Sequence, residues 1–319
     1  LLIITPTPGI ETVDYNVINS FNGCADTFQL SVVVNPAPFI NTINDIICSG
    51  GSFDTIPNPI ASGNFIPSGT TYSWSVAANN SVLNETGSVN QNPNIFNSGP
   101  LTSSSITNTT LAYSVIPTSG NCIGSTFNLN VTVTPTPSIS NQLDSICSGN
   151  FPTISALPGN VIPPTTFYTW SIIADNPNIS GQSNQGVGIG DLSNQQLTNQ
   201  TNIPQSLTYS ITPESGPCPG NPFTLTVTVN PGPSLDTAYY SICSGSSLTV
   251  TLGQPNDIVP PGTTFTWNVL ANPNIIGEVS NSNPSPSFNT GILQNILFVN
   301  DTVEYTITPN GAPGIPQCN

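Results

Sequence analysis

The sequence predicts an all-β chain of tandem antiparallel β-sandwiches, and three observations carry this prediction. The tetrapeptide Ile-Cys-Ser-Gly occurs three times, around Cys48, Cys147 and Cys243, at intervals of 99 and 96 residues. Apolar and polar residues alternate over short runs, as expected for strands with one buried face. Proline-rich segments close the periods, and no stretch shows a helical period. A fixed period of this length indicates tandem copies of one small domain.

The composition excludes several classes of function. The 319 residues contain no Lys, Arg, His or Met, and fifteen Asp and Glu give a net charge of -15. Such a surface cannot neutralise phosphates, so we expect neither a nucleic-acid partner nor binding to an anionic membrane. No apolar run is long enough for membrane insertion. Without His or Lys, a Ser or Cys nucleophile lacks its usual base, so we expect no catalytic residues and no enzyme activity.

Residues 1–38 are predicted to be the C-terminal part of a truncated repeat. The run around Tyr15 alternates, and Phe28–Val34 alternates again with Phe, Leu and Val on one face. Two prolines end this second strand, because proline cannot donate a hydrogen bond to a sheet. Leu1 is not an initiator Met, so we expect the chain to be an internal fragment of something longer.

The first complete repeat is predicted over residues 39–137. Its Ile-Cys-Ser-Gly segment is followed by an alternating strand around Trp74 and by a second one around Tyr113. A last strand, Phe127–Val133, alternates before Pro135-Thr136-Pro137 closes the repeat. This order of elements is the template for the copies that follow.

Two further repeats are predicted over residues 138–233 and 234–319. The third copy has no Phe-x-Leu-x-Val-x-Val strand at its end. The aromatic residues of the alternating strands have apolar neighbours two residues away, so we expect them to be buried in the cores. These predicted core residues are Trp74, Trp170, Trp267, Tyr113, Tyr209 and Tyr305.

Five sequence blocks recur in one order. They are Ile-Cys-Ser-Gly, a Thr-Thr pair shortly before Trp, Tyr-(Ser/Thr)-(Val/Ile)-x-Pro, Gly-x-Cys-x-Gly and Phe-x-Leu-x-Val-x-Val-x-Pro-x-Pro. This set resembles the PKD-like and immunoglobulin-like repeats of large Bacteroidota surface adhesins, including gliding-motility-associated proteins exported by type IX secretion. The resemblance implies immunoglobulin-like sandwiches arranged end to end. The Gly-x-Cys block is clear at Cys122 and Cys218 and departs from the pattern before Cys318.

The seven cysteines are predicted to form disulfides. With no His and no Cys-x-x-Cys pair they do not suggest a metal site, and we expect no cofactor. Disulfides favour an oxidising, extracellular location at the cell surface. Each copy has an early and a late cysteine, and the resemblance supports pairing within a copy. The predicted pairs are Cys48–Cys122, Cys147–Cys218 and Cys243–Cys318, with Cys24 unpaired.

A competing pattern would join cysteines across the proline-rich joints. Its pairs are Cys24–Cys48, Cys122–Cys147 and Cys218–Cys243, with Cys318 left alone. An outgoing strand of eight residues moves the chain about 26 Å away, and the stiff joint discourages its return. We therefore favour pairing within each copy, because a disulfide needs Cα atoms within roughly 7 Å.

Four Asp-(Ser/Thr)-apolar triplets resemble the O-glycosylation site of Bacteroidota. Glycans on these hydroxyls would be bulky and would make the surface more soluble. The candidate residues are Thr55, Ser145, Thr237 and Thr302.

The function implied by the resemblance is a structural stalk or filament segment that spaces an adhesive part from the cell, in gliding motility or surface adhesion. Its partners would be neighbouring repeats of the same long chain, surface glycans or other copies. Pro-x-Pro linkers fit this role, since they favour extended conformations. Two alternatives stay open. One is a carbohydrate-binding repeat. The other is a filament subunit that assembles by head-to-tail donation of the spare strand Thr27–Val34.

Overall fold

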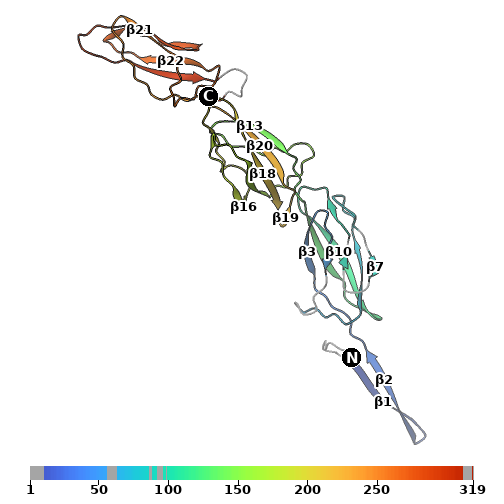
Figure 1. Cartoon of the computed structure of the whole chain (residues 1–319). Helices are drawn as coiled ribbons and strands as arrows, with labels where there is room; N and C mark the ends of the chain where they lie inside the picture. The colour runs from blue at the N-terminus through green and yellow to red at the C-terminus, as the bar shows by residue number, and fades with distance from the viewer. Residues whose placement is uncertain are drawn as a thin grey trace. The chain divides into compact units, whose positions relative to one another are not determined.

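The computed structural model describes residues 11–55, 63–85, 88–91, 96–97, 99–311 and 318. Every regular element in this part of the chain is a β-strand, which confirms the predicted all-β class (Figure 1). The chain divides into two compact units. The first comprises residues 1–137, 161–166 and 214–220, and the second comprises residues 138–160, 167–213 and 221–319. The predicted start of the truncated repeat, residues 1–10, lies outside the described residues.

Residues 11–34 form a two-stranded hairpin. Strands β1 (Glu11–Phe21) and β2 (Cys24–Val34) pair antiparallel along their whole length. The turn is Asn22-Gly23, and both residues have positive φ angles, 47° and 85°. This pair of residues favours the tight turn whose twist matches that of the flanking strands.

The first repeat is a sandwich of one large sheet and smaller strand pairs. The large sheet has the order β3-β12-β10-β5-β7, with β11 paired to β10, and β3 runs parallel to β12. Its strands are β3 (Ile43–Cys48), β5 (Thr70–Val76), β7 (Ser88–Gln91), β10 (Thr109–Ser119), β11 (Cys122–Ile123) and β12 (Phe127–Thr134). The small pairs are β4 (Asp54–Thr55) with β8 (Phe96–Asn97), and β6 (Val82–Leu83) with β9 (Thr102–Ser103).

The second repeat has the same plan. Its large sheet has the order β13-β20-β18-β14-β16, with β19 paired to β18, and β13 runs parallel to β20. The strands are β13 (Gln142–Cys147), β14 (Thr166–Ala174), β16 (Gln185–Ile189), β18 (Gln205–Ser215), β19 (Cys218–Pro219) and β20 (Phe223–Asn230). The small pair is β15 (Ile179–Ser180) with β17 (Thr198–Asn199).

The third repeat has two three-stranded sheets, of order β21-β25-β23 and β24-β22-β26. The strands are β21 (Ser246–Val250), β22 (Thr264–Leu270), β23 (Ile275–Ile276), β24 (Asn281–Ser285), β25 (Phe288–Asn295) and β26 (Glu304–Asn310). Among the described residues, β26 has a strand partner on one side only. Residues 238–243, which correspond to β3 and β13 in sequence, are not in a strand.

The cores contain the predicted aromatic residues. Trp74, Trp170 and Trp267 are 7%, 4% and 5% exposed, and Tyr113 and Tyr209 are fully buried. The indole N–H groups of Trp170 and Trp267 donate to the carbonyls of Ser183 and Val279, at 3.0 and 2.9 Å. These bonds satisfy the polar atom of an otherwise apolar side chain. Tyr305, the sixth predicted core residue, is only half-buried, and among the described residues its strand β26 pairs with β22 alone.

Candidate functional site: the staggered disulfides

The Ile-Cys-Ser-Gly motif builds the same tight turn in all three repeats. Its glycines, Gly50, Gly149 and Gly245, have φ angles of 87°, 87° and 86°. Only glycine adopts this left-handed conformation without strain, so the turn requires it. The backbone N–H of each glycine donates to a carbonyl across the sandwich, that of Leu101, Leu197 or Leu293, at 2.7–2.8 Å.

The serine of the motif forms a hydrogen bond with the same opposite segment as the glycine. The hydroxyl oxygens of Ser49, Ser148 and Ser244 accept the backbone N–H of Ser103, Asn199 and Asn295, at 2.9, 3.0 and 3.0 Å. Serine and glycine therefore fix the backbone on one side of the motif cysteine. The motif is a structural element that holds a sulfur atom in place.

Two disulfides join the early cysteine of one repeat to the late cysteine of the next. Cys48 bonds to Cys218 and Cys147 bonds to Cys318, with Cα–Cα distances of 5.5 and 5.3 Å. The sequence separations are 170 and 171 residues. Each bond lies within one compact unit, because the tip of the β18–β19 hairpin belongs to the first unit together with Cys48.

The predicted pairs Cys48–Cys122, Cys147–Cys218 and Cys243–Cys318 are therefore wrong, and so are the competing pairs across single joints. The reason is the direction of the strands. Cys48 ends β3 beside Thr134, at the end of the sheet where β10 begins, whereas Cys122 follows the far end of β10. Strand β10 has 11 residues. At ~3.3 Å per residue it separates the two cysteines by roughly 33 Å, far beyond disulfide reach.

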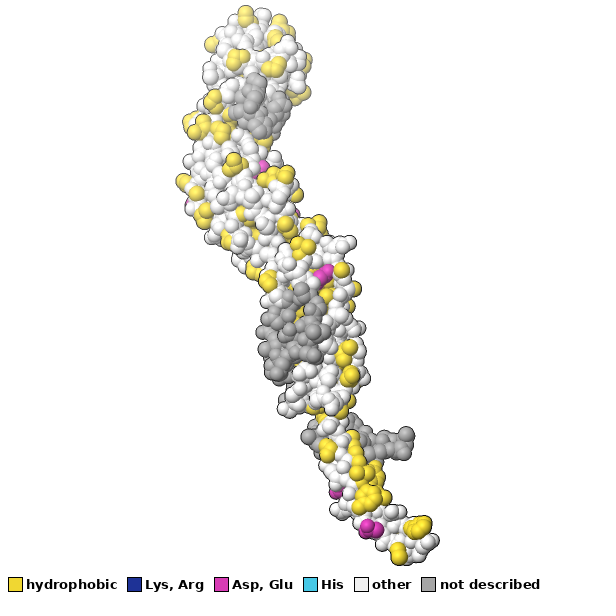
Figure 2. Space-filling model, turned by 90° about the vertical axis from the view of Figure 1, so that its right-hand side faces the viewer, with side chains coloured by type: hydrophobic (Ala, Val, Ile, Leu, Met, Phe, Trp, Pro, Cys, Tyr) yellow, Lys and Arg dark blue, Asp and Glu magenta, His cyan; other side chains and the backbone are white. Residues whose placement is uncertain are grey.

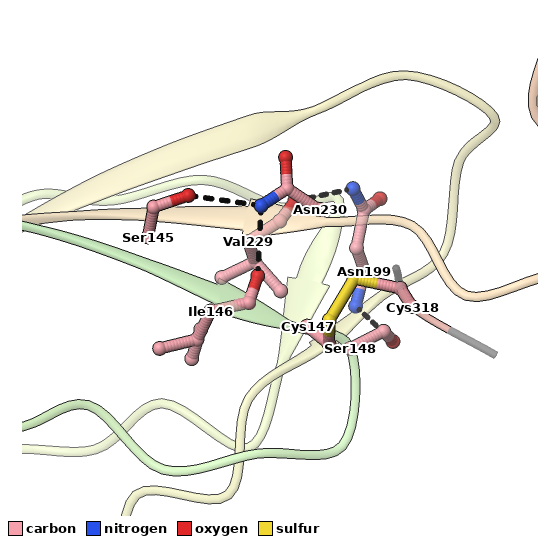
Figure 3. Close-up of a disulfide and its surroundings, with 8 residues drawn as sticks. All are labelled: Ser145, Ile146, Cys147, Ser148, Asn199, Val229, Asn230 and Cys318. Carbon is pink, nitrogen blue, oxygen red and sulfur yellow. Dashed lines mark hydrogen bonds between the residues drawn. A yellow bond between two sulfur atoms is a disulfide. The ribbon is translucent and has the colours of Figure 1, made fainter. Parts of the chain in front are cut away.

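Two buried asparagines hold the surroundings of the Cys147–Cys318 bond (Figure 3). The side-chain amide of Asn230 donates to the Ser145 hydroxyl at 2.9 Å and to the Ile146 carbonyl at 3.1 Å. The amide of Asn199 donates to the Val229 carbonyl at 2.8 Å. Each amide thus satisfies backbone or hydroxyl groups next to the disulfide. Sequence reasoning missed both asparagines, since the chain is rich in Asn and neither belongs to a recurring block.

Three cysteines are not in disulfides: Cys24, Cys122 and Cys243. Cys24 was predicted to be unpaired, whereas Cys122 and Cys243 were expected to be bonded. Cys243 is exposed at the start of the third motif turn. Cys122 is half-buried, and its thiol donates to the backbone carbonyl of Asn35 at 3.5 Å. Asn35 follows β2, so the late cysteine of the first repeat lies against the end of the hairpin's last strand.

The acidic residues have local structural roles. Asp144 accepts the backbone N–H groups of Ser145 and Thr153, both at 2.8 Å. Hydrogen bonds from Ser193 lower the pKa of Asp191, and a hydrogen bond from the Asn274 side chain is the main cause of a lowered pKa at Asp301. In the part of the chain that the structure describes, no three metal-binding side chains come together. No helix among the described residues could cross a membrane.

The candidate glycosylation residues differ in their surroundings. Ser145, Thr237 and Thr302 are exposed. Ser145 accepts the Asn230 amide beside the disulfide, whereas Thr237 and Thr302 follow exposed or half-exposed aspartates. Thr55 lies in β4, and its side chain is outside the described part. Glycosylation of these residues stays a prediction.

A sequence model of the PKD-like domain matches the chain three times, at residues 45–137, 144–233 and 240–319. No curated protein matches the chain. Among solved structures, cadherin domains 3–6 of Protocadherin Gamma B2 are 13% identical over 69% of this chain and 60% of that one, with a TM-score of 0.30.

Two other solved structures are similar at the same level. A three-domain immunoglobulin segment of titin is 12% identical over 86% of this chain and 94% of that one, with a TM-score of 0.31. The human Desmocollin-1 ectodomain is 12% identical over 89% of this chain and 60% of that one, with a TM-score of 0.28. This chain thus spans about 60% of the protocadherin and desmocollin chains. The three tandem sequence matches cover most of its residues, and the chain belongs to the PKD-like domain family.

Proposed function

We propose that this chain is a stalk segment of a large extracellular bacterial surface protein, which withstands mechanical tension and holds an adhesive part away from the cell. The observation that supports this role is the overlap of the two disulfides: residues 48–218 and 147–318 share the stretch 147–218. The bonds also fit an oxidising location outside the cell. Gliding motility and type IX secretion are part of the proposal through the sequence resemblance alone.

The overlap gives three covalent routes between Cys48 and Cys318. One follows the chain for 99 residues to Cys147 and crosses that disulfide. A second crosses to Cys218 and follows the chain for 100 residues. The third and shortest crosses to Cys218, follows the chain back for 71 residues to Cys147 and crosses the other disulfide. The backbone without disulfides runs 270 residues between the same atoms. Tension applied to the ends would therefore be shared by three parallel segments, and the shortest of them would limit how far the completely unfolded chain extends.

Single-molecule stretching of the chain tethered at both ends tests this proposal. Reduction of the disulfides should lengthen the fully stretched chain by about 700 Å, since roughly 200 more residues are released at about 3.5 Å each. The force at which the stretched chain refolds should also fall when the disulfides are reduced. If neither the stretched length nor the force needed to stretch the chain changed with reductant, the disulfides would not carry the tension and the proposal would be contradicted.

The absence of Lys and Arg supports an extracellular role in a second way. Trypsin-like proteases have no site to cleave in this chain, folded or unfolded. We propose no catalytic role. A carbohydrate-binding repeat would need exposed aromatic side chains that stack on a sugar. All three tryptophans are buried, so this alternative is not favoured. Surface glycans and neighbouring repeats stay proposed partners.

A further inference from the structure

Two segments pair as neighbouring strands in the first and third repeats but not in the second. Their positions are counted from the motif glycine and from the leucine whose carbonyl accepts the glycine N–H. The pairs are Asp54–Asn97 and Thr55–Phe96 in the first repeat, and Thr249–Asn289 and Val250–Phe288 in the third. The equivalent positions of the second repeat, 153–154 and 192–193, are not in strands. The second repeat therefore lacks a strand pairing that the other two have.

Side chains of β13 hold one of these segments in the second repeat. The Asp144 carboxylate accepts the Thr153 N–H at 2.8 Å and the Thr153 hydroxyl at 3.3 Å. The Gln142 side-chain amide accepts the Ser155 N–H at 2.9 Å and donates to the Ser155 carbonyl at 2.8 Å. The residues equivalent to Gln142 are Ile43 and Ala238, which cannot form such bonds. Residues 153–155 thus bond to β13 and not to residues 192–193.

A pocket of about 330 Å³ lies between the two unpaired segments. It is lined by residues 151–154, by residues 190–193 and by Tyr168 of β14. At the position of Leu192 the third repeat has Phe288, which is 5% exposed. The smaller Leu192 leaves space that a phenyl ring takes up in the third repeat. The pocket therefore results from the missing pairing and from this smaller side chain.

One polar group that lines the pocket has no partner within the protein. Tyr168 is 5% exposed, and no described residue forms a hydrogen bond with its hydroxyl. Burial raises the pKa of this hydroxyl. The third repeat has Phe265 at the same position, so the fold of a repeat does not require the hydroxyl. A buried hydroxyl without a partner is costly, and a ligand in the pocket would supply the missing hydrogen bond.

The pocket combines apolar surface with hydrogen-bonding groups. Phe151 lines it and is 43% exposed, and Pro152 and Leu192 add buried apolar surface. The Asp191 carboxylate accepts the Ser193 N–H at 3.0 Å. A carboxylate has several lone pairs, so Asp191 can accept further hydrogen bonds from a ligand. A ligand that fits this pocket has an apolar face and hydroxyl groups at its edge.

The charge of the chain excludes an anionic ligand. The sequence has no Lys, Arg or His, and its net charge is -15. On the face shown in Figure 2, the charged side chains are all acidic. A phosphate or carboxylate in the pocket would meet Asp191 with no cation to neutralise either charge. Phosphorylated sugars, uronic acids and sialic acids are therefore unsuitable ligands.

We propose that the pocket of the second repeat binds one neutral pyranose ring at the end of a glycan. The C–H face of the ring would pack against Phe151, and its hydroxyl groups would form hydrogen bonds with Tyr168 and Asp191. An apolar side chain of a partner protein would fill the same space but leave both polar groups unpaired.

This site differs from a sugar platform built on the tryptophans, which are buried in all three repeats. It belongs to the second repeat alone, because the equivalent segments are paired in the other two. A glycan bound here is compatible with the stalk role and does not depend on it.

Saturation-transfer NMR and titration calorimetry of the complete chain test the site. The probes are the methyl pyranosides of glucose, galactose, mannose, fucose and N-acetylglucosamine. Glucuronic acid, tetramethylammonium and p-cresol are the anionic, cationic and aromatic controls. We expect at least one neutral pyranoside to bind with a Kd on the order of 1 mM, since a single ring makes few contacts. No binding of any pyranoside at about 20 mM, or tighter binding of a control, would overturn the proposal.

Three substitutions introduce residues that the third repeat has at the same positions, so the fold should tolerate them. Leu192→Phe fills the pocket and should abolish binding. Tyr168→Phe removes one hydrogen bond and should weaken binding about fivefold. Phe151→Ser removes the exposed ring and should weaken binding by about fivefold or more. The counterparts in the third repeat are Phe288, Phe265 and Ser247.

Phe167→Thr is the matched control for the exposed ring. Phe167 is 50% exposed and precedes Tyr168, so it lies on the opposite face of β14. Its counterpart in the third repeat is Thr264, and the substitution should change the Kd by less than about twofold. Thermal melting followed by circular dichroism confirms that each variant is folded.

Equal losses for Phe167→Thr and Phe151→Ser, or full binding by a folded Leu192→Phe chain, would place the sugar outside the pocket and refute the site. The stretching experiment measures the disulfides and not this pocket, so either result can fail without the other.

Discussion

The same sequence segment has different structures in the second and third repeats. In the second, Gln142–Cys147 forms strand β13 parallel to β20, with Gln142 and Ile146 buried. In the third, residues 238–243 form no strand, and Tyr239 is 91% exposed. Both segments end in Ile-Cys, and in both the N–H of the motif glycine donates to a leucine carbonyl, that of Leu197 or Leu293. In the second repeat the Ser148 N–H also donates to the carbonyl of Asn230 at 2.9 Å. In the second repeat β20 pairs with this segment, and in the third no strand of the described residues does.

This comparison separates local from non-local structure in the repeat. The turn needs only its glycine, its serine and the opposite segment, so it forms in every repeat. The strand before it needs a partner from nearly a whole repeat away, and β-structure depends strongly on such neighbours. The position of the motif cysteine is thus fixed on one side by a local turn and on the other by a distant strand.

The second and third repeats should differ most in the unfolding free energy that is lost when their motif cysteine is substituted. Cys147→Ser removes a bond that closes 171 residues, worth about 5 kcal/mol of unfolding free energy on the chain-entropy model. Cys243→Ser changes an exposed, unbonded residue and should leave the stability of the single chain within about 0.5 kcal/mol. Chemical denaturation followed by the single tryptophan of each repeat measures both, after Trp→Phe substitution of the other two. Similar losses for the two variants would contradict the disulfide assignment.

The next largest difference in stability is expected between buried positions of strand β20 and exposed positions of strand β2. Leu225→Ala empties a fully buried position in β20 and should cost roughly 3 kcal/mol of stability in the second repeat. Leu30, at the equivalent position of β2, is already 48% exposed, so Leu30→Ala should cost less than about 1 kcal/mol of stability. Chemical denaturation in dilute, non-reducing solution measures both losses. A large loss for Leu30→Ala would show that the hairpin is packed against something.

The fold could be predicted from the sequence because its signals are local. Alternation identified the strands around Trp74 and Trp170, and apolar neighbours identified their buried faces. The disulfides could not be predicted, since their partners depend on strand direction and on the parallel pairing of Ile47 with Val133. Early and late positions in one copy look like natural partners in sequence, but they lie at opposite ends of the sheet. Knowing that β3 pairs parallel with β12 would have excluded the pair Cys48–Cys122.

Alkaline pH should also distinguish the two repeats. Burial raises the pKa of Tyr209, whose hydroxyl donates to Gln195 at 3.1 Å. Burial, and then the Glu278 carboxylate, raise the pKa of the half-buried Tyr305. Below pH 10 both tyrosines are neutral in the folded and unfolded chain, so their contribution to stability is complete. Above this pH the unfolded chain loses phenol protons first, and stability falls.

For Tyr209 this fall should reach about 1.4 kcal/mol per pH unit above pH 10. Absorbance of the phenolate during a pH titration measures the effect, with Tyr209→Phe and Tyr305→Phe to assign each signal. We expect Tyr209 to ionise only as the second repeat unfolds and Tyr305 to ionise before unfolding. Ionisation of Tyr209 in a chain that keeps its native tryptophan fluorescence would contradict the buried environment.

The smallest difference in stability between the second and third repeats is expected at the motif glycine, where their backbones are alike. A Cβ atom at Gly149 or Gly245 would meet no atom within 4 Å, so Gly→Ala adds only backbone strain at φ angles of 87° and 86°. This strain costs about 1 kcal/mol for an ordinary residue in the left-handed region. Because the glycine N–H makes the same hydrogen bond to a leucine carbonyl in both repeats, we expect equal losses for Gly149→Ala and Gly245→Ala, read from Trp170 and Trp267. A clearly smaller loss at Gly245 would show that the turn of the third repeat is already loosened without its last strand, and that the local and non-local parts of the repeat are coupled.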